Sequence, residues 1–242
     1  MKDYQPQVKQ RFAGLDEQIE AFVSSACAGD IAGMREQVAE GLDVNDSDAF
    51  GDTLLEQVIG SLGFCPPSSR YPVIKEMLRL GADPCGLNAD GSTPLFSAVL
   101  TMDTELLRIL LDGGADPNAI LLIPIDVDVG FTAANMQAMK TIETMDESLY
   151  DWAEFAYRYE VWDTDLPEEP GAADQVDQDA WLRFLDRLAL KYGKRRPDFL
   201  RLLRQRGALA ITELRQRSEF RRLLAQHRVS PVLRFEQPAR RI

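Results

Sequence analysis

The sequence predicts an all-α fold, a solenoid of stacked helical hairpins, from three observations. The tetrapeptide Gly-Ala-Asp-Pro occurs at residues 81–84 and again at residues 114–117, a spacing of 33 residues. A leucine-rich amphipathic stretch precedes each copy, at residues 73–80 and 106–111. Glycine directly after such a stretch is typical of a helix C-terminus, because glycine adopts the left-handed conformation without strain. A fixed period of this length indicates helical units that bury their apolar faces against one another.

The first predicted helical pair covers residues 19–40. Two amphipathic stretches, at residues 19–27 and 31–40, flank a Gly-Asp turn, and residues 41–45 form a degenerate copy of the glycine motif. Apolar residues at spacings of three and four favour helices in both stretches.

The next two pairs each begin with a threonine in front of an apolar run. Thr53 and Thr93 are expected to cap the first helix of each pair, since a threonine hydroxyl accepts a hydrogen bond from a backbone N–H of the first turn. Pro94 suits that first turn because its missing N–H would have no partner there. The two starts are 40 residues apart, and the Pro-rich residues 63–69 are predicted to form the loop that adds seven residues to the period.

These residues resemble the ankyrin repeat, whose pattern runs D-x-x-G-x-T-P-L-H-x-A and ends L-L-x-x-G-A-D-x-N. The matching positions are Gly91, Thr93, Pro94, Leu95, Ala98, Leu110, Leu111, Gly114, Ala115, Asp116 and Asn118. The resemblance covers about residues 19–120, and the first pair lacks the Thr-Pro-Leu start, as an N-terminal capping repeat often does. Phe96 and Glu56 replace the histidine of the family pattern, so some of its usual hydrogen bonds are expected to be missing.

Beyond residue 118 the period stops, and the chain is predicted to divide into three parts. Residues 1–118 hold the N-terminal helix and the ankyrin repeats. Residues 119–180 form an acidic insertion with aromatic residues, and residues 181–242 form a degenerate terminal repeat (near 181–210) with basic capping helices. Apolar spacing predicts helices at residues 131–159, 181–192, 197–206 and 211–226, with an exposed loop at 166–178.

The second and third parts carry net charges of opposite sign. Residues 119–180 carry 2 basic and 15 acidic side chains, whereas residues 181–242 carry 17 basic and 5 acidic ones, within a net charge of −12 for the chain. One interpretation is internal complementarity, in which the basic helices pair with the acidic segment. The other is that at least one of the two surfaces faces a partner.

Composition and motifs argue against catalysis and predict a cytoplasmic protein. The three cysteines form no CxxC pair, and neither a membrane span nor a secretory signal is expected. The single histidine, His227, excludes most histidine-based catalytic sites. The pair Asp126 and Asp128 offers only a weak candidate for a metal site, so we expect no cofactor, no metal, no small-molecule substrate and no enzymatic activity.

Two sets of residues are predicted to bind a protein partner. The ankyrin resemblance implies contacts from the turn tips and first helices, which by position are Ala49, Phe50, Asp52, Ala89, Asp90 and Ser92, extended by Leu100 and Thr101. Aromatic side chains among carboxylates in the insertion form the second set, which is Asp151, Trp152, Glu154, Phe155, Trp162, Asp163 and Asp165. Large aromatic side chains supply binding energy, and carboxylates attract a basic partner. The same aromatic spacing is also typical of a helix that faces a core.

The architecture is similar to that of several bacterial immunity proteins, which neutralise a cognate toxin. This similarity implies an antitoxin that binds and inhibits a toxin, which we expect to be basic. An ankyrin adaptor or regulator of an unrelated cellular protein is the alternative. Nucleic-acid binding through the Arg-rich C-terminal helices is a minor alternative, since the acidic surface of the insertion would repel phosphate.

Overall fold

The computed structural model describes residues 5–48, 51–88, 93–118, 148–163 and 165–218, with side-chain burial described from residue 17 onward. Two compact units are present, unit 1 (Met1–Ala119) and unit 2 (Ile120–Ile242). The described residues contain helices and no strand, apart from an isolated bridge between Ser47 and Thr53. None of the described helices is both long and apolar enough to cross a membrane.

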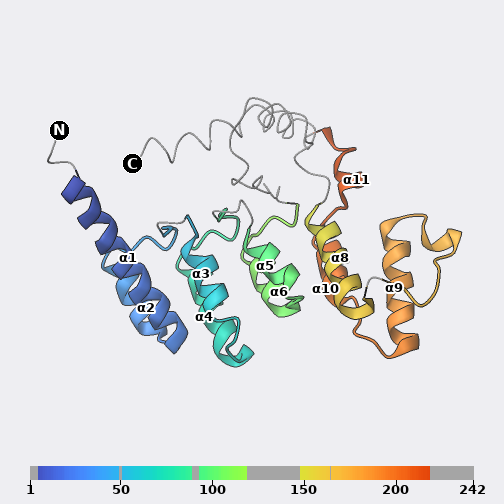
Figure 1. Ribbon diagram of the computed structural model, residues 1–242, viewed down its shortest axis with the longest axis horizontal. Coiled ribbons are helices and arrows are strands. Elements are labelled where there is room, and N and C mark those ends of the chain that lie inside the picture. The colour runs from blue at the N-terminus through green and yellow to red at the C-terminus, as the bar shows by residue number, and fades with distance from the viewer. Residues whose placement is uncertain (1–4, 49–50, 89–92, 119–147, 164, 219–242) are drawn as a thin grey trace. The chain divides into compact units, whose positions relative to one another are not determined.

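Unit 1 is a row of helical hairpins (Figure 1), which confirms the predicted solenoid. The three pairs are α1 (Gln5–Ala28) with α2 (Ile31–Ala39), α3 (Leu54–Ser61) with α4 (Pro67–Arg79), and α5 (Pro94–Leu100) with α6 (Thr104–Asp112). Helix α3 contacts both α1 and α5, and α4 contacts α6, so each pair packs on the next. The apolar face that a single hairpin leaves open is therefore covered by its neighbour.

The repeated glycines adopt the predicted left-handed conformation. The φ angles are +101° at Gly81 and +100° at Gly114, so the chain turns away from α4 and α6 in the same manner. Asn45 then joins two successive loops, because its Nδ2 donates to the Gly81 carbonyl (3.0 Å) and its Oδ1 accepts from the Asp83 N–H (2.7 Å). The recurring motif thus ends the hairpins, and Asn45 ties the first hairpin's loop to that of the second.

The two threonines behave differently. Thr53 Oγ1 accepts a hydrogen bond from the Glu56 N–H at 3.3 Å, which confirms the predicted cap of α3. The same prediction for Thr93 is wrong, because its hydroxyl makes no capping hydrogen bond and is buried without a partner. The predicted loop at residues 63–69 is also shorter than expected, since α4 already begins at Pro67, whose ring suits a first helical turn.

Glu56, which replaces the family's histidine, is largely buried in unit 1. Its Oε2 accepts a hydrogen bond from the Ser97 hydroxyl at 3.1 Å, across from α3 to α5. Burial, together with the negative charge of Asp52, raises the pKa of the Glu56 carboxyl to about 7, although the Ser97 hydrogen bond opposes this rise. The carboxyl therefore changes its charge near neutral pH inside the contact between two repeats.

Glu56→Gln is expected to remove a pH dependence of stability. An unfolded chain loses the Glu56 proton near its ordinary pKa of 4.5, whereas the folded chain keeps it to about pH 7. The free energy of unfolding should therefore fall by about 2 kcal/mol as the pH rises through this window, and stay level above it. Urea unfolding at about pH 5 and about pH 8 measures this difference. Glu40→Gln, at an exposed glutamate, is the control that should leave the difference unchanged.

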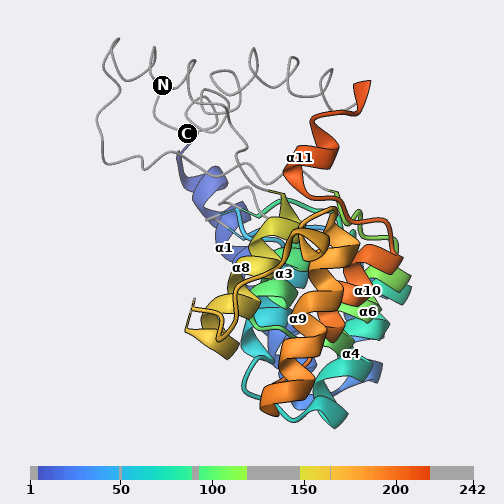
Figure 2. The same ribbon diagram turned by 90° about the vertical axis from the view of Figure 1, so that its right-hand side faces the viewer.

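Unit 2 contains α8 (Leu149–Trp162), the 3₁₀ helix η1 (Ala172–Asp174), α9 (Gln178–Tyr192), α10 (Asp198–Gln205) and α11 (Ile211–Leu214) (Figure 2). Helix α10 packs closely against α8, and α9 packs against η1. Helix α10 therefore has more backbone contact with α8 than with α9, to which the ion pairs Arg201–Asp186 and Arg204–Asp179 also join it.

Two helix predictions in unit 2 need correction. A helix was expected at residues 131–159. In the described residues the helix begins at Leu149, directly after the capping residue Ser148, and it continues to Trp162. The helix expected at 211–226 is interrupted, because α11 ends at Leu214 and a turn follows.

Candidate functional site

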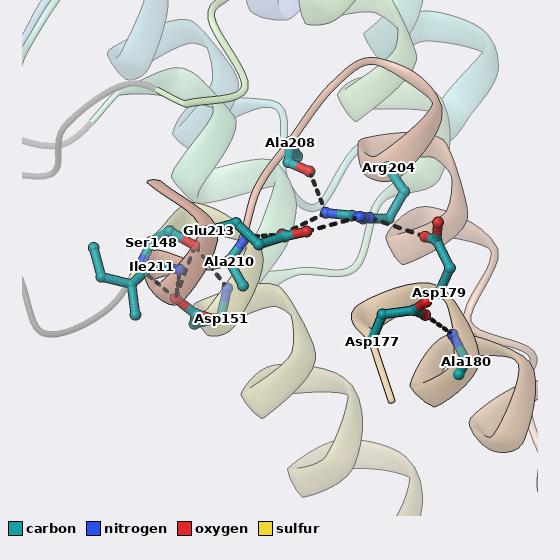
Figure 3. Close-up of polar contacts among 10 residues, drawn as sticks. All are labelled: Ser148, Asp151, Asp177, Asp179, Ala180, Arg204, Ala208, Ala210, Ile211 and Glu213. Carbon is teal, nitrogen blue, oxygen red and sulfur yellow. Dashed lines mark hydrogen bonds and ion pairs between the residues drawn. The ribbon is translucent and has the colours of Figure 1, made fainter. Parts of the chain in front are cut away.

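The start of α8 is fixed by hydrogen bonds through one carboxylate (Figure 3). Asp151 Oδ2 accepts from the Ser148 N–H (2.7 Å), from the Ser148 hydroxyl (2.8 Å) and from the Ile211 N–H (2.9 Å). The Asp151 N–H donates in return to Ser148 Oγ (3.2 Å), which completes a capping box, and the Ile211 bond joins α8 to the first residue of α11. Asp151 was predicted to contact a partner, but its carboxylate is already occupied within the fold.

Arg204 on α10 holds a second cluster together (Figure 3). Its guanidinium bonds to Glu213 through two nitrogens (2.7 and 3.2 Å), to Asp179 (3.2 Å) and to the Ala208 carbonyl (2.9 Å). It also lies 5.4 Å from the ring centre of the buried Tyr150. No local sequence pattern marks this cluster, because Asp179 and Glu213 lie 25 and 9 residues from Arg204.

Tyr157 fixes the middle of α8. Its ring is fully buried and lies 6.1 Å from the Phe199 ring of α10. Burial raises the pKa of its hydroxyl to about 12, so the hydroxyl keeps its proton and donates to the Arg195 carbonyl at 2.7 Å. The outward face of α8 is therefore held on a rigid support.

Many basic residues of unit 2 are neutralised inside the unit. Ion pairs join Lys191 to Glu168 (2.6 Å), Arg187 to Asp174 (2.8 Å) and Arg196 to Asp186 (2.7 Å). Lys191 and Arg187 thus pair with acids of residues 119–180, as internal complementarity predicts, whereas Asp186 belongs to the basic segment itself. Such pairing leaves fewer cations available for phosphate than the sequence had indicated, so it weakens the case for nucleic-acid binding.

The outward face of α8 carries an aromatic stripe, formed by Trp152, Phe155 and Tyr159. Phe155 is 53% exposed and Tyr159 is 55% exposed. The Phe155 ring contacts that of Trp152 edge-on (6.0 Å) and stacks with that of Tyr159 (6.1 Å). Large apolar side chains in contact with one another at a surface are typical of a binding site.

A hollow of about 530 Å³ lies at the C-terminal end of this stripe, and we call it the α8 hollow. Its aromatic walls are Tyr159, Trp162 and Tyr192, and its charged rim holds Glu160, Asp163, Asp165 and Lys194; Val161 and Pro167 complete it. Asp163 ends α8 in the left-handed conformation, with a φ of +53°. The hollow brings together three residues predicted from sequence, namely Trp162, Asp163 and Asp165.

The sequence suggested that Trp162 is an exposed anchor for a partner, but the structure buries it. It is only 8% exposed, and its ring packs edge-on against Tyr192 at 6.2 Å. Helical spacing shows that residues share a face but does not show which face is buried. Trp162 therefore shapes the wall of the hollow, and the exposed aromatic surface comes from Phe155 and Tyr159.

The three acids of the hollow are distinctive because none of them is bound to a cation among the described residues. Within the described residues, the carboxylates of Glu160, Asp163 and Asp165 make no hydrogen bond or ion pair. Most other described carboxylates of unit 2 bind a cation or cap a helix. Lys194 offsets only part of the negative charge, so the hollow would attract a cation.

Glu154 lies at a separate hollow of about 490 Å³, with Asp177, Trp181 and Glu213 on its walls. Burial raises the pKa of the Glu154 carboxyl, against a hydrogen bond from Trp181. Asp177 caps α9 by accepting from the Ala180 N–H (2.7 Å), and Glu213 binds Arg204 (Figure 3). Because all three carboxylates already have hydrogen-bond partners, this hollow has less charge to offer a ligand.

The predicted contacts in unit 1 are described only in part. Ala49, Phe50, Ala89, Asp90 and Ser92 lie outside the described residues. Leu100 is 49% exposed at the end of α5, and Thr101 beside it is exposed, with its hydroxyl bound to the Ser97 carbonyl at 2.9 Å. Asp52 is partly buried beside the start of α3. The weak metal candidates Asp126 and Asp128, and His227, also lie outside the described residues.

Comparison with known proteins agrees with this architecture. The family model of the ankyrin repeat matches residues 90–120, which contain α5 and α6. No curated protein matches the chain. Ankyrin repeats are non-catalytic modules of protein–protein interaction, and the left-handed glycines and stacked hairpins extend the same arrangement towards the N-terminus. The chain therefore contains an ankyrin repeat at residues 90–120.

Proposed function

We propose that this chain is an immunity protein, a non-catalytic cytoplasmic module that binds and inhibits a cognate basic toxin. The observation that supports it is the α8 hollow, where Glu160, Asp163 and Asp165 have no counter-ion among the described residues. Carboxylates without a counter-ion speed the encounter with a positively charged protein and favour it over acidic ones. A toxin that handles nucleic acid needs a basic surface, so an acidic inhibitor would complement it.

An adaptor function is the second candidate, and exposed Leu100 and Thr101 in unit 1 favour it. These residues extend the surface that the ankyrin resemblance implies for a partner. An adaptor would bind a cellular protein without protecting against any toxin. Substitution of Phe50, Asp90 or Leu100 should then weaken binding while the fold persists.

Co-expression with the product of the neighbouring reading frame tests both candidates. For an immunity protein we expect a 1:1 complex in size-exclusion chromatography with light scattering, weakening with added salt, and restored growth of cells that make the toxin. A complex without growth protection would indicate the adaptor. If neither a complex nor protection appears, the immunity proposal is wrong.

A further inference from the structure

We propose that the outward face of α8 binds a basic amphipathic segment of the partner. An apolar side chain of that segment would lie on Phe155 and Tyr159, and a lysine or arginine side chain would enter the α8 hollow. This inference rests on the proposed function and specifies which surface and which partner chemistry carry it out.

The aromatic stripe supplies the apolar half of the site. Phe155 and Tyr159 remain more than half exposed, although their rings stack on each other at 6.1 Å. Because Tyr157 and Asp151 fix the middle and the start of α8, these rings are presented on a rigid helix. A preorganised aromatic surface loses little conformational entropy on binding, which increases affinity.

The hollow supplies the cation site. Glu160, Asp163 and Asp165 stand beside the rings of Tyr159, Trp162 and Tyr192, so a cation there would meet both carboxylates and aromatic groups. The fold already contains a cation held by a carboxylate and an aromatic ring next to the hollow. The Lys191 ammonium binds Glu168 at 2.6 Å and lies 5.5 Å from the Tyr192 ring centre. Carboxylates and aromatic rings both attract such a charge.

The length of α8 sets the spacing that the partner needs. Phe155 and Asp163 are eight residues apart, and α8 ends between them at Trp162, so they lie about 12 Å apart along the helix axis. A partner helix covers a similar distance between side chains about seven residues apart. An extended segment covers it in about three or four residues. The partner segment should therefore carry its basic residue at one of these distances from an apolar one.

A synthetic amphipathic peptide tests the inference on the full chain. The probe is a tryptophan-free helix of about four turns with leucine on one face and arginine beside it, and the comparison peptide carries glutamine in place of arginine. Calorimetric titration gives the affinity, and the tryptophan fluorescence of the chain, to which Trp162 in the wall of the hollow and Trp152 in the stripe both contribute, reports binding. We expect the arginine peptide to bind at least about tenfold more tightly than the glutamine peptide.

Matched substitutions locate the binding. Asp165→Asn and Tyr159→Ser should each weaken binding of the arginine peptide by about tenfold. Glu169→Gln removes an equal charge from the same segment outside the hollow, and Leu190→Ser changes a side chain that is 63% exposed on α9. These two controls should alter the affinity less than twofold, within about 0.4 kcal/mol.

The inference is overturned if the arginine peptide does not bind, or if the controls weaken binding as much as the site substitutions do. The proposed function is judged separately, by the complex with the co-expressed protein. A complex that persists unchanged in Asp165→Asn and Tyr159→Ser would leave the proposed function standing and place the contact elsewhere.

Discussion

Arg204→Ala is expected to lower the free energy of unfolding of unit 2 by about 2–4 kcal/mol. The side chain is only 16% exposed and binds Glu213, Asp179 and the Ala208 carbonyl at once. Its removal leaves two carboxylates without their counter-ion and a backbone carbonyl without a donor. The loss should also release α11 from α10, because Glu213 belongs to α11.

Tryptophan fluorescence during urea unfolding measures this loss. All three tryptophans of the chain, Trp152, Trp162 and Trp181, lie in unit 2. Arg204→Lys should recover only part of the stability, since an ammonium cannot reproduce the two-nitrogen contact with Glu213. Arg187→Ala breaks a single exposed ion pair with Asp174 and should cause only a small change. Equal effects of Arg204→Ala and Arg187→Ala would contradict the role assigned to Arg204.

Leu107→Ala is expected to lower the free energy of unfolding of unit 1 by about 3 kcal/mol. The Leu107 side chain is completely buried on α6, which packs against both α4 and α5. Truncation removes apolar contact and leaves a cavity that helices on two sides cannot easily fill. Far-UV circular dichroism during urea unfolding gives the change.

Leu100→Ala provides the matched control within the same repeat. Leu100 is 49% exposed, so its truncation should cost less than about 1 kcal/mol. If Leu107→Ala and Leu100→Ala had the same small effect, the hairpins would not be packed as described.

The repeat region was predictable because its signals are local. The glycine motif fixes where α4 and α6 end, and Gly81 and Gly114 have nearly the same φ. Thr53 caps α3 as its position indicates, whereas Thr93 does not cap α5, although its sequence context is closer to the family pattern. A cap depends on the hydroxyl rotamer and on burial, which the residue type does not determine.

Unit 2 was harder to predict because its contacts are distant along the chain. The aromatic and acidic composition of α8 pointed to the correct segment, but helical spacing did not reveal that Trp162 is buried while Phe155 and Tyr159 are exposed. The pairing of α8 with α10 links residues about 40 positions apart, and no sequence period marks it. The role of Asp151 depends on the Ile211 N–H, 60 residues away.

Hydroxyl-radical footprinting of the chain, alone and in complex with its basic partner, tests the central claim most directly. Oxidation of an aromatic side chain reports its exposure, so the two exposed aromatic residues of α8, Phe155 and Tyr159, are direct reporters of contact. We predict that Phe155 and Tyr159 become protected in the complex, while the fully exposed Phe64 of unit 1 reacts as before. Unchanged oxidation of Phe155 and Tyr159, together with protection elsewhere, would contradict the proposal that the outward face of α8 binds the partner.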